Sequence, residues 1–454
     1  MATALKQINM AVSVAFQDAG EATRSIEIMK IIRDFAPDGY SIRGVFFTHG
    51  SRFEDKVLDN GFTIQRVEPV MQGNGYLSDL KPTANNFIGD KDLACRLLQG
   101  EIAALRTCRP DLILHGFWPI AGIARRIIEP SIPAVCFLPL PFEPSMFSTH
   151  LLQEVPDQIR PLIYLPRSVQ REIMRRMPPA WKLKAPILKQ SNLIYASEKC
   201  GWSHAPIRNL FDMLKADLTI VNDLSYFYRG MTLPNRFVLT GPLYAAADSD
   251  DRLDPGIANI FQKQSSDQVN IFCTMGSSAK KKFLIEAVKA IVSLPAGQFH
   301  AVVLVPKAVC PIEEIEPLVD GNPDIRITDQ FVPAKLVNAQ ADITVCHGGQ
   351  GTIQTAIACG CPLIGFAMQP EQQINLDNVE QAGAGIRISS ARWNRRNIIN
   401  SIKKMAKNPT WKQNALRLSR EMQQEDSRRK VAAAVWNYIT NRDRSTRDES
   451  DVKR

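Results

Sequence analysis

The sequence predicts an α/β protein built from two doubly wound parallel sheets. Short apolar runs alternate with longer amphipathic segments along nearly all of the 454 residues, which is typical of parallel strands joined by crossover helices. The alternation breaks at a small, acidic stretch, residues 244–256, and then starts again. We therefore expect a linker between two lobes there.

Ten segments are expected to be strands because they are short, apolar and rich in β-branched residues. They are 10–16, 43–48, 111–115, 134–138, 217–221, 237–240, 270–275, 301–305, 343–346 and 362–366. Between them, residues 21–35 and 280–293 carry apolar side chains at helical spacing. Residues 431–439 form an apolar helix, and 441–454 hold almost no apolar side chain and are expected to be a disordered tail.

One segment, residues 156–189, departs from the alternation and is rich in Pro, Arg and Met. Arg167, Arg171 and Arg175 recur every four residues there, which predicts a basic face on a short amphipathic helix. Such a face is either a plain solvated surface or a contact site for a membrane or an acceptor.

Composition narrows the class of protein. Hydrophobic residues make up 45% of the chain, but no apolar run approaches the 18 or so residues of a membrane-spanning helix. No cleavage site follows the first apolar stretch, so we expect a buried strand there and not a signal peptide. The expected compartment is the cytoplasm, with peripheral contact at the inner face of a membrane as the alternative.

A positive net charge suits nucleic acid, an anionic lipid or a phosphorylated small molecule as partner, and charge alone does not choose among them. A net charge of +9 suits an acidic partner, but the basic residues are not interleaved with aromatic ones as in nucleic-acid-binding stripes. The nine cysteines include no CxxC pair, and the six histidines show no ligand spacing. We expect no nucleic acid, no metal and no cofactor.

The strongest motif lies between the expected strand 343–346 and the helix after it. It consists of His347, Gly348, Gly349, Gln350, Gly351 and Thr352. Glycines at such a turn let the backbone approach a ligand, and the N–H groups of the helix start point at it with the positive end of the dipole. The turn suits a diphosphate, with His347 and Thr352 as side-chain donors. Tight packing alone would explain the glycines equally well.

A second motif follows the strand 362–366. It places Glu371, Gln372 and Asn375 at the carboxyl edge of the sheet, where open α/β sheets bind ligands. A carboxylate beside a carboxamide suits adjacent sugar hydroxyls, while the alternative is an ordinary acidic residue at a helix start.

A third turn, of small residues, follows the strand 270–275. Gly276, Ser277 and Ser278 stand there and could face the same phosphate. No Walker motif, GxSxG motif or zinc signature competes with these three turns.

Together the motifs resemble the nucleotide-sugar-binding half of GT-B glycosyltransferases. The sequence contains HGGxGT, AxxxGxP, PEQQIN and then Gly383 and Gly385. This order is similar to the branch that contains macrolide and glycopeptide glycosyltransferases, sterol glucosyltransferases and plant UDP-glycosyltransferases. The close match runs from near residue 331 to the C-terminal helix.

The resemblance implies a GT-B fold, with two Rossmann-like lobes that face a cleft. Residues 1–243 would form the acceptor lobe, 244–256 the linker and 257–425 the nucleotide-sugar lobe. A C-terminal helix, 426–440, would return to the first lobe ahead of the tail.

It also implies roles for the donor residues. His347 and the backbone of 349–352 would hold the donor diphosphate, with Ser277 and Ser278 flanking it.

Glu371 and Gln372 would hold hydroxyls of the donor sugar, and Phe331 and Val332 would lie at the nucleotide base. The plant signature is incomplete, because Phe331 and Ala334 replace its usual Trp and Gln. A plant-type preference for UDP-glucose is therefore not implied.

Relatives carry the catalytic base as a Gly-His or Gly-Asp pair after the first strand, where this chain has Gly20 and Glu21. Glu21 could deprotonate an acceptor hydroxyl, or it could merely cap its helix; Asp18 is the second candidate. Asp111 is expected to be structural and His115 to be a core histidine.

The resemblance implies inverting transfer of a hexose from a UDP- or dTDP-sugar to a hydroxyl of a small-molecule or lipid-like acceptor. Two alternatives stay open: a sugar-nucleotide epimerase on the same fold, and a non-catalytic partner protein that binds the nucleotide sugar. The acceptor, the sugar, the nucleotide and the oligomeric state are not predicted.

Overall fold

The computed structural model divides into two compact units. It describes residues 5–17, 19–73, 75–157, 159, 161–243, 252–276, 279–330 and 332–452, with side chains up to residue 443. The first unit combines the chain up to Ser148 with Pro178–Leu243 and the part from Asp426 onward. The second combines Thr149–Met177 with the chain from residue 244 to Glu425. Residues 149–177, which we expected in the first lobe, thus belong to the second unit.

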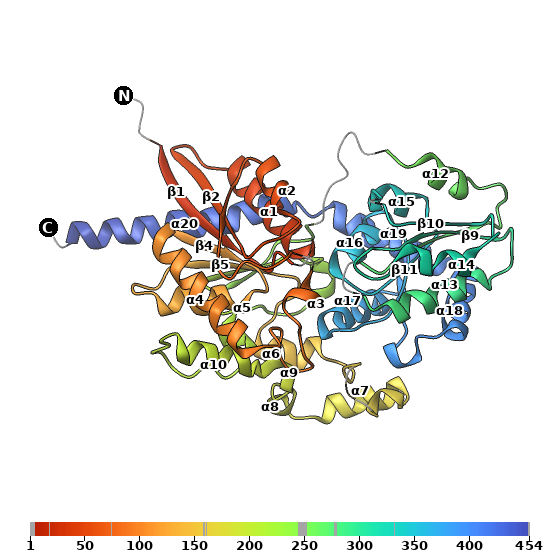
Figure 1. Cartoon of the computed structure of the whole chain (residues 1–454), viewed down its shortest axis with the longest axis horizontal. Coiled ribbons are helices and arrows are strands. Elements are labelled where there is room, and N and C mark those ends of the chain that lie inside the picture. The colour runs from red at the N-terminus through yellow and green to blue at the C-terminus, as the bar shows by residue number, and fades with distance from the viewer. Residues whose placement is uncertain are drawn as a thin grey trace. The chain divides into compact units, whose positions relative to one another are not determined.

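The first unit is built on a parallel sheet of seven strands in the order β3-β2-β1-β4-β5-β6-β7 (Figure 1). The strands are β1 (Lys6–Ser13), β2 (Tyr40–Thr48), β3 (Thr63–Arg66), β4 (Leu112–His115), β5 (Ala134–Leu138), β6 (Leu218–Val221) and β7 (Phe237–Leu239). The order runs outward from β1 on one side and from β4 on the other, which is the doubly wound arrangement.

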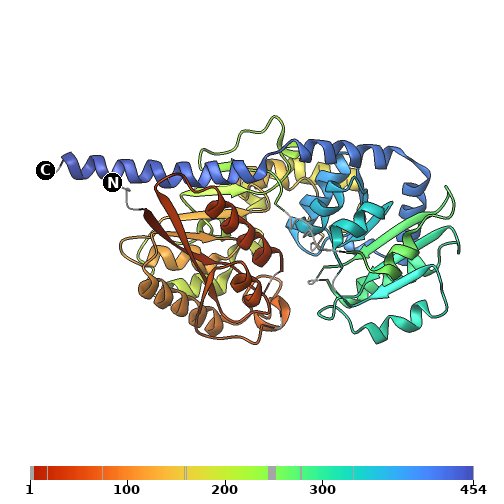
Figure 2. The ribbon, with the colours of Figure 1, turned by 90° about the horizontal axis from the view of Figure 1, so that it is seen from above.

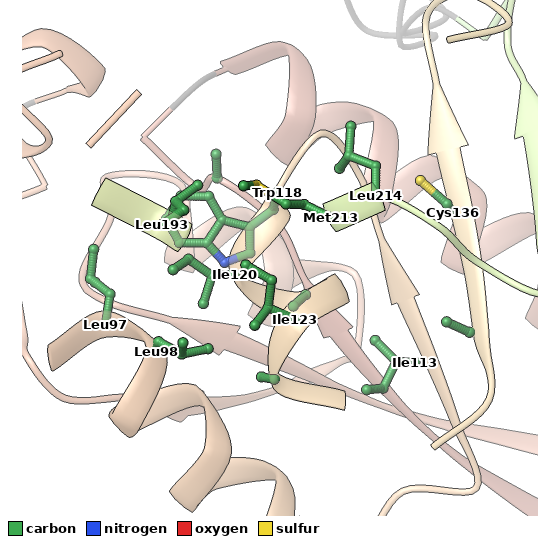
Figure 3. Close-up of a cluster of buried hydrophobic side chains, with 14 of the residues drawn as sticks. Leu97, Leu98, Ile113, Trp118, Ile120, Ile123, Cys136, Leu193, Met213 and Leu214 are labelled. Carbon is green, nitrogen blue, oxygen red and sulfur yellow. The ribbon is translucent and has the colours of Figure 1, made fainter. Parts of the chain in front are cut away.

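Helices cover both faces of this sheet. They are α1 (Ala19–Asp34), α2 (Glu54–Asp59), α3 (Tyr76–Asp79), α4 (Lys91–Cys108), α5 (Pro119–Ile127), α6 (Pro144–Met146), α8 (Pro179–Lys182), α9 (Pro186–Lys189), α10 (Ser191–Lys199), α11 (Leu210–Met213) and α20 (Ser427–Val452). On one face α20 lies along α1, and Trp436 Nε1 donates to the Ile32 carbonyl at 3.0 Å (Figure 2). On the other, Trp118 packs among side chains of α4 and α5 (Figure 3).

The second unit repeats the design with six parallel strands in the order β10-β9-β8-β11-β12-β13. They are β8 (Val269–Thr274), β9 (Phe299–Leu304), β10 (Ile325–Thr328), β11 (Ile343–Cys346), β12 (Leu363–Gly365) and β13 (Gly385–Arg387). Its helices are α7 (Arg167–Arg176), α12 (Pro255–Phe261), α13 (Lys281–Val292), α14 (Glu316–Val319), α15 (Ala334–Gln340), α16 (Gln350–Ala358), α17 (Pro370–Gln381), α18 (Arg395–Lys407) and α19 (Thr410–Gln423). α13 and α18 share one hydrophobic core with the sheet.

All ten expected strands are present, and three further strands were missed. The missed strands β3, β10 and β13 are all edge strands. β3 and β10 contain no fully buried residue, so they lack the apolar run that marks a central strand, and β13 is only three residues long. The expected helices at 21–35 and 280–293 are α1 and α13.

The C-terminal stretch differs from the expected disordered tail, because the backbone of α20 stays helical to Val452. Its last described side chains are anchored: Asp443 accepts hydrogen bonds from Lys6 Nζ at 2.5 Å and Tyr40 Oη at 3.1 Å. Arg442 donates to the Asp111 carbonyl at 3.0 Å. These bonds tie a strongly charged stretch to the first unit.

Within the described ranges, no helix has both the length and the hydropathy needed to cross a bilayer. The same residues contain no cluster of three or more His, Cys, Asp or Glu side chains suited to a metal ion.

Candidate functional site

The imidazole of His347 lies between two glycines at the carboxyl edge of the second sheet. His347 follows β11, and a Cβ atom at Gly276, the second residue after β8, would come within 2.4 Å of its ring. A Cβ at Gly349 would come within 2.7 Å of the same ring. Gly276 also has φ +59°, a backbone conformation that residues with a Cβ rarely adopt. These glycines therefore make the space in which the imidazole sits.

Burial keeps this imidazole uncharged. His347 is only 6% exposed, and burial lowers its pKa to about 4. Its Nδ1 atom is buried and has no hydrogen-bond partner among the described residues. A neutral imidazole can donate from one nitrogen and accept at the other, so His347 can offer a single neutral hydrogen bond to a ligand oxygen.

The start of α16 supplies backbone donors next to this ring. Gly349 precedes the helix, and no side chain caps it; the first N–H groups of a helix have no partner within the helix. A Cβ at Gly351 would meet nothing within 4 Å, so the first turn is open there. Thr352 follows in the same turn. This geometry suits a phosphate.

The first two turns of α17 are bonded to the same glycine-rich turn. Asn375 Nδ2 donates to Glu371 Oε1 at 2.5 Å and to the Gly348 carbonyl at 3.3 Å. Gln372 Oε1 accepts from the Met368 N–H at 2.9 Å. The structure thus brings together the two motifs that the sequence places about twenty residues apart.

Four predicted site residues lie outside the described ranges: Asp18, Ser277, Ser278 and Phe331. Their roles stay predictions. Val332 is described and is buried, as is the side chain of Gln350.

In the first unit, Glu21 lies in the first turn of α1 and reaches across to the turn after β4. Its Oε2 atom accepts a hydrogen bond from the Phe117 N–H at 3.0 Å, and Arg24 Nη1 lies 3.5 Å from its Oε1. A Cβ at Gly116 would stand 1.7 Å from Oε2. The carboxylate is therefore held in a defined place at the carboxyl edge of the sheet, with 11% of its side chain exposed.

The contacts of Glu21 involve residues that sequence reasoning did not find. Arg24 and Gly116 carry no motif of their own: one is a basic residue on an amphipathic helix, and the other a glycine after a strand. Arg24 lies three residues after Glu21 on α1, whereas Gly116, 95 positions away, comes next to Glu21 through the pairing of β1 with β4.

Asp111 and His115, which we expected to be structural, make structural contacts. Asp111 Oδ2 accepts from the Asn9 N–H at 2.8 Å, which joins β1 to the start of β4. His115 is fully buried, and its Nδ1 lies 3.0 Å from the Gly116 carbonyl oxygen. Burial lowers its pKa to about 4, so it is a neutral core histidine at pH 7.

Sequence comparisons match about a third of the chain to known proteins. The family described as "Erythromycin biosynthesis protein CIII-like, C-terminal domain" matches residues 292–437. A PGL/p-HBAD biosynthesis glycosyltransferase of Mycobacterium tuberculosis is 27% identical over 161 residues, which are 34% of this chain and 33% of the relative. The chain thus matches about a third of the length of such relatives.

Structural comparisons extend over nearly the whole chain. The glycotransferase of kitacinnamycin is 20% identical, with a TM-score of 0.60 over 94% of this chain and 98% of that one. The spinosyn rhamnosyltransferase SpnG in complex with thymidine diphosphate is 14% identical, with a TM-score of 0.53 over 95% of this chain and 100% of that one. At such identities the likeness establishes the fold.

The paired sheets, the glycine-rich turn beside His347 and the sequence matches agree. Residues 292–437 match the erythromycin CIII-like C-terminal domain family, and the chain has the two-sheet GT-B fold of the solved glycosyltransferases.

Proposed function

We propose that the protein is an inverting glycosyltransferase that moves a hexose from a UDP- or dTDP-sugar to a hydroxyl group of a small-molecule or lipid-like acceptor. The observation that carries this proposal is a pair of hydrogen bonds that links the motif at 370–375 to the glycine-rich turn at 347–352 in the second unit. Asn375 bonds both Glu371 and the Gly348 carbonyl, so side chains suited to sugar hydroxyls lie next to a turn suited to a diphosphate.

The donor half stabilises the leaving group. When the sugar C1–oxygen bond breaks, negative charge develops on the nucleoside diphosphate. The N–H groups at the start of α16 and the neutral His347 would donate hydrogen bonds to it, and such donors stabilise charge best when they are fixed in advance. The reaction as proposed uses no metal and no cofactor besides the nucleotide sugar.

The acceptor half supplies the base. Glu21 would take the proton of the acceptor hydroxyl while that oxygen attacks C1 from the face opposite the diphosphate, which inverts the anomeric carbon. The Phe117 N–H and Arg24 favour the ionised carboxylate that this step requires. Asp18 is the second candidate.

The named relatives support the substrate classes. The spinosyn rhamnosyltransferase has been solved with thymidine diphosphate and also with spinosyn aglycone, and the mycobacterial relative acts in PGL/p-HBAD biosynthesis. These names support a nucleotide sugar as donor and a small or lipid-like molecule as acceptor.

A thermal-shift panel tests the donor site first. UDP, dTDP, GDP and their hexose conjugates are added to the protein, and a ligand at 100 times its Kd should stabilise it by about 2.7 kcal/mol. Stabilisation by UDP or dTDP compounds is expected, while the absence of a shift with every compound would contradict the proposal. Product analysis then separates transfer, which consumes an acceptor, from epimerisation, which needs none.

We also propose peripheral contact of the second unit with an anionic membrane at the inner face. The exposed face of α7 carries Arg171, Arg175 and Arg176, and Val169 on the same helix is 42% exposed. Exposed arginines beside an apolar side chain suit an anionic lipid surface. Sedimentation with phosphatidylglycerol vesicles should exceed that with phosphatidylcholine vesicles, and equal sedimentation would contradict this contact.

A further inference from the structure

The segment 149–177 is bound into the second unit by a buried cluster of charges around Arg387. This arginine, in β13, is 2% exposed at its side chain and pairs with three carboxylates. Its Nη1 lies 3.1 Å from Asp157 Oδ1 and its Nε 2.5 Å from Asp377 Oδ1, and its Nη2 pairs with Glu154. Asp157 and Glu154 belong to the segment, whereas Asp377 lies on α17.

A second arginine joins the cluster from the segment's side, and Arg171 also pairs with Glu154 at 2.7 Å. Arg167, at the start of α7, pairs with Glu154 at 2.8 Å and with Asp377 at 3.1 Å, and it also pairs with Glu380 of α17. Burial alone would raise the pKa of Glu154, but the hydrogen bond from Arg167 and the charge of Arg387 outweigh it and hold the pKa below its ordinary value. Glu154 is therefore ionised at neutral pH, and its loss would remove the carboxylate of the segment that Arg387 and Arg167 share.

Gln373 adds neutral bonds between the same two elements. Its Oε1 accepts from the Asp157 N–H at 3.0 Å, and its Nε2 donates to the Val155 carbonyl at 3.3 Å. Gln373 is 1% exposed. A buried amide that satisfies two backbone groups specifies one position of the segment along α17.

Helix α17 presents different faces to the segment 149–177 and to the glycine-rich turn. Residues 373, 377 and 380 are spaced as one stripe of a helix and hold the segment, while 371 and 375 form another stripe and contact the glycine-rich turn. At 100° per residue, residues 371 and 373 lie about 160° apart around the axis when measured the short way. A shift of the segment would thus displace α17 toward or away from the turn.

We propose that Glu154, Arg387 and Gln373 are positioning residues for the donor sugar. They clamp the segment 149–177 against one face of α17 and so hold Glu371 and Asn375 on the opposite face at the turn 347–352. This inference rests on the proposed function, because it takes Glu371 as a contact of the donor sugar, with Asn375 holding its carboxylate.

The test separates affinity for the sugar from affinity for the diphosphate. Dissociation constants of the preferred nucleoside diphosphate and of its hexose conjugate are measured by calorimetry for wild type and Glu154→Gln. The conjugate should bind at least about tenfold more weakly to the variant, while the diphosphate alone, held at 347–352, should change by less than about threefold. General destabilisation would weaken both ligands together, and that outcome would overturn the proposal.

Glu172→Gln is the matched control, because Glu172 lies on α7 of the same segment but pairs only with the exposed Arg175 and Arg176 among the described residues. It should bind both ligands as wild type does. Gln373→Met removes the two neutral bonds without a change of charge, and it serves if Glu154→Gln does not fold.

Hydrogen exchange of free protein gives a readout that needs no ligand. Amides of residues 371–381 should exchange faster in Glu154→Gln or Gln373→Met and at the wild-type rate in Glu172→Gln. Unchanged exchange in both clamp variants would overturn the clamp. If wild type binds no nucleotide but the exchange rises, the proposed function and the sugar-positioning role fail while the clamp stands as a structural one.

Discussion

The two units share one sheet design, and they differ where each sheet ends. In the first, Asn9 and Asp111 join β1 to β4: the Asn9 N–H donates to Asp111 Oδ2 at 2.8 Å, and the Asp111 N–H donates to the Asn9 carbonyl at 2.8 Å. In the second, Asn270 and Asp342 join β8 to β11 through the same two bonds, at 2.9 and 2.8 Å. The amino ends of the central strand pairs are thus held alike.

At the carboxyl ends the same strand pairs carry different chemistry. In the first unit a carboxylate from the first turn of α1, Glu21, fills the space of a missing Cβ at Gly116 after β4. In the second unit an imidazole after β11, His347, fills the space of a missing Cβ at Gly276 after β8. Each pair lies at the point where strand order reverses, the place where open α/β sheets bind ligands. One design therefore holds a proton acceptor in one unit and a neutral donor in the other.

Replacement of Glu21 tests the acidic half of this comparison and should have the largest effect. Glu21→Gln keeps the bond from the Phe117 N–H but cannot accept a proton at neutral pH, so kcat should fall by about 10² to 10⁴-fold. Nucleotide affinity should stay unchanged, because that site lies in the other unit. Steady-state transfer assays and calorimetry measure the two. Glu27→Gln on the same helix is the control, and equal transfer by wild type and Glu21→Gln would remove Glu21 as the base.

Replacement of His347 tests the neutral half. His347→Ala removes one fixed donor at the diphosphate, and kcat should fall by about 10² to 10³-fold. Because burial puts the pKa of His347 near 4, diphosphate affinity of the wild type should show no step from this residue between pH 5.5 and 8. A step in that range that His347→Ala abolishes would show that the imidazole binds in its charged form. His300→Gln, on β9, is the control.

The sequence was sufficient to predict the central strands and the glycine-rich turn at 347–352, because both are local signals. Central strands are continuous apolar runs, and the turn at 347–352 keeps its glycines within six residues. The edge strands β3 and β10 were missed because half-exposed strands lack that run.

The partners of the site residues could not be predicted, because they depend on tertiary packing. Gly116 is 95 positions from Glu21 and Glu154 is 233 from Arg387. The assignment of 149–177 to the first lobe followed chain order, whereas the buried pairs with Arg387 bind this segment to the second unit.

The buried carboxylates sharpen the contrast between the units. Glu154 in the second unit has guanidinium partners, whereas Glu101 in the first lies beside His49, with 3.9 Å between Oε2 and Nε2. Burial raises the pKa of Glu101 to about 7, although the Ser13 hydroxyl lowers it in part, and burial lowers the pKa of His49 to about 4. At pH 6 both side chains are therefore neutral.

This difference predicts a pH dependence for Glu101→Gln. A carboxyl whose pKa rises on folding stabilises the protein below its unfolded value, near 4.5, and that stability is lost as pH rises through about 7. Relative to wild type, the variant should therefore gain about 3 kcal/mol between pH 4.5 and pH 8. Denaturant unfolding at several pH values measures the difference, in which the shared titration of His49 cancels. A difference that does not change with pH would mean that Glu101 is ionised in the folded protein at all these values.

The two glycines that make room for the site side chains can be compared directly. Gly116→Ala should push the Glu21 carboxylate aside, and Gly276→Ala should push the His347 ring and also strain a backbone at φ +59°. Each should cost about 1 to 3 kcal/mol of stability and reduce transfer. Gly351→Ala is the control for stability alone, because its Cβ meets no protein atom within 4 Å and alanine favours a helix, while its backbone belongs to the turn proposed to hold the diphosphate. Thermal unfolding and transfer assays on the three variants would contradict the comparison if Gly116→Ala left transfer unchanged.

The smallest effects are expected at the amino ends, where the units are alike. Asp111→Asn and Asp342→Asn each weaken a charge-assisted bond to a strand N–H, at a cost of about 0.5 to 1.5 kcal/mol. Asp342 also pairs with the partly exposed Lys263 at 2.8 Å, which adds little, so the two costs should be similar. Because the residues lie in different units and share no partner, the costs should add in the double variant. Denaturant unfolding monitored separately in each unit, by tryptophan fluorescence of Trp118 and Trp393 in single-tryptophan backgrounds, assigns each cost to its sheet. A loss in one unit several times that in the other would mean that the matching Asn–Asp bonds do not hold the two central strand pairs equally.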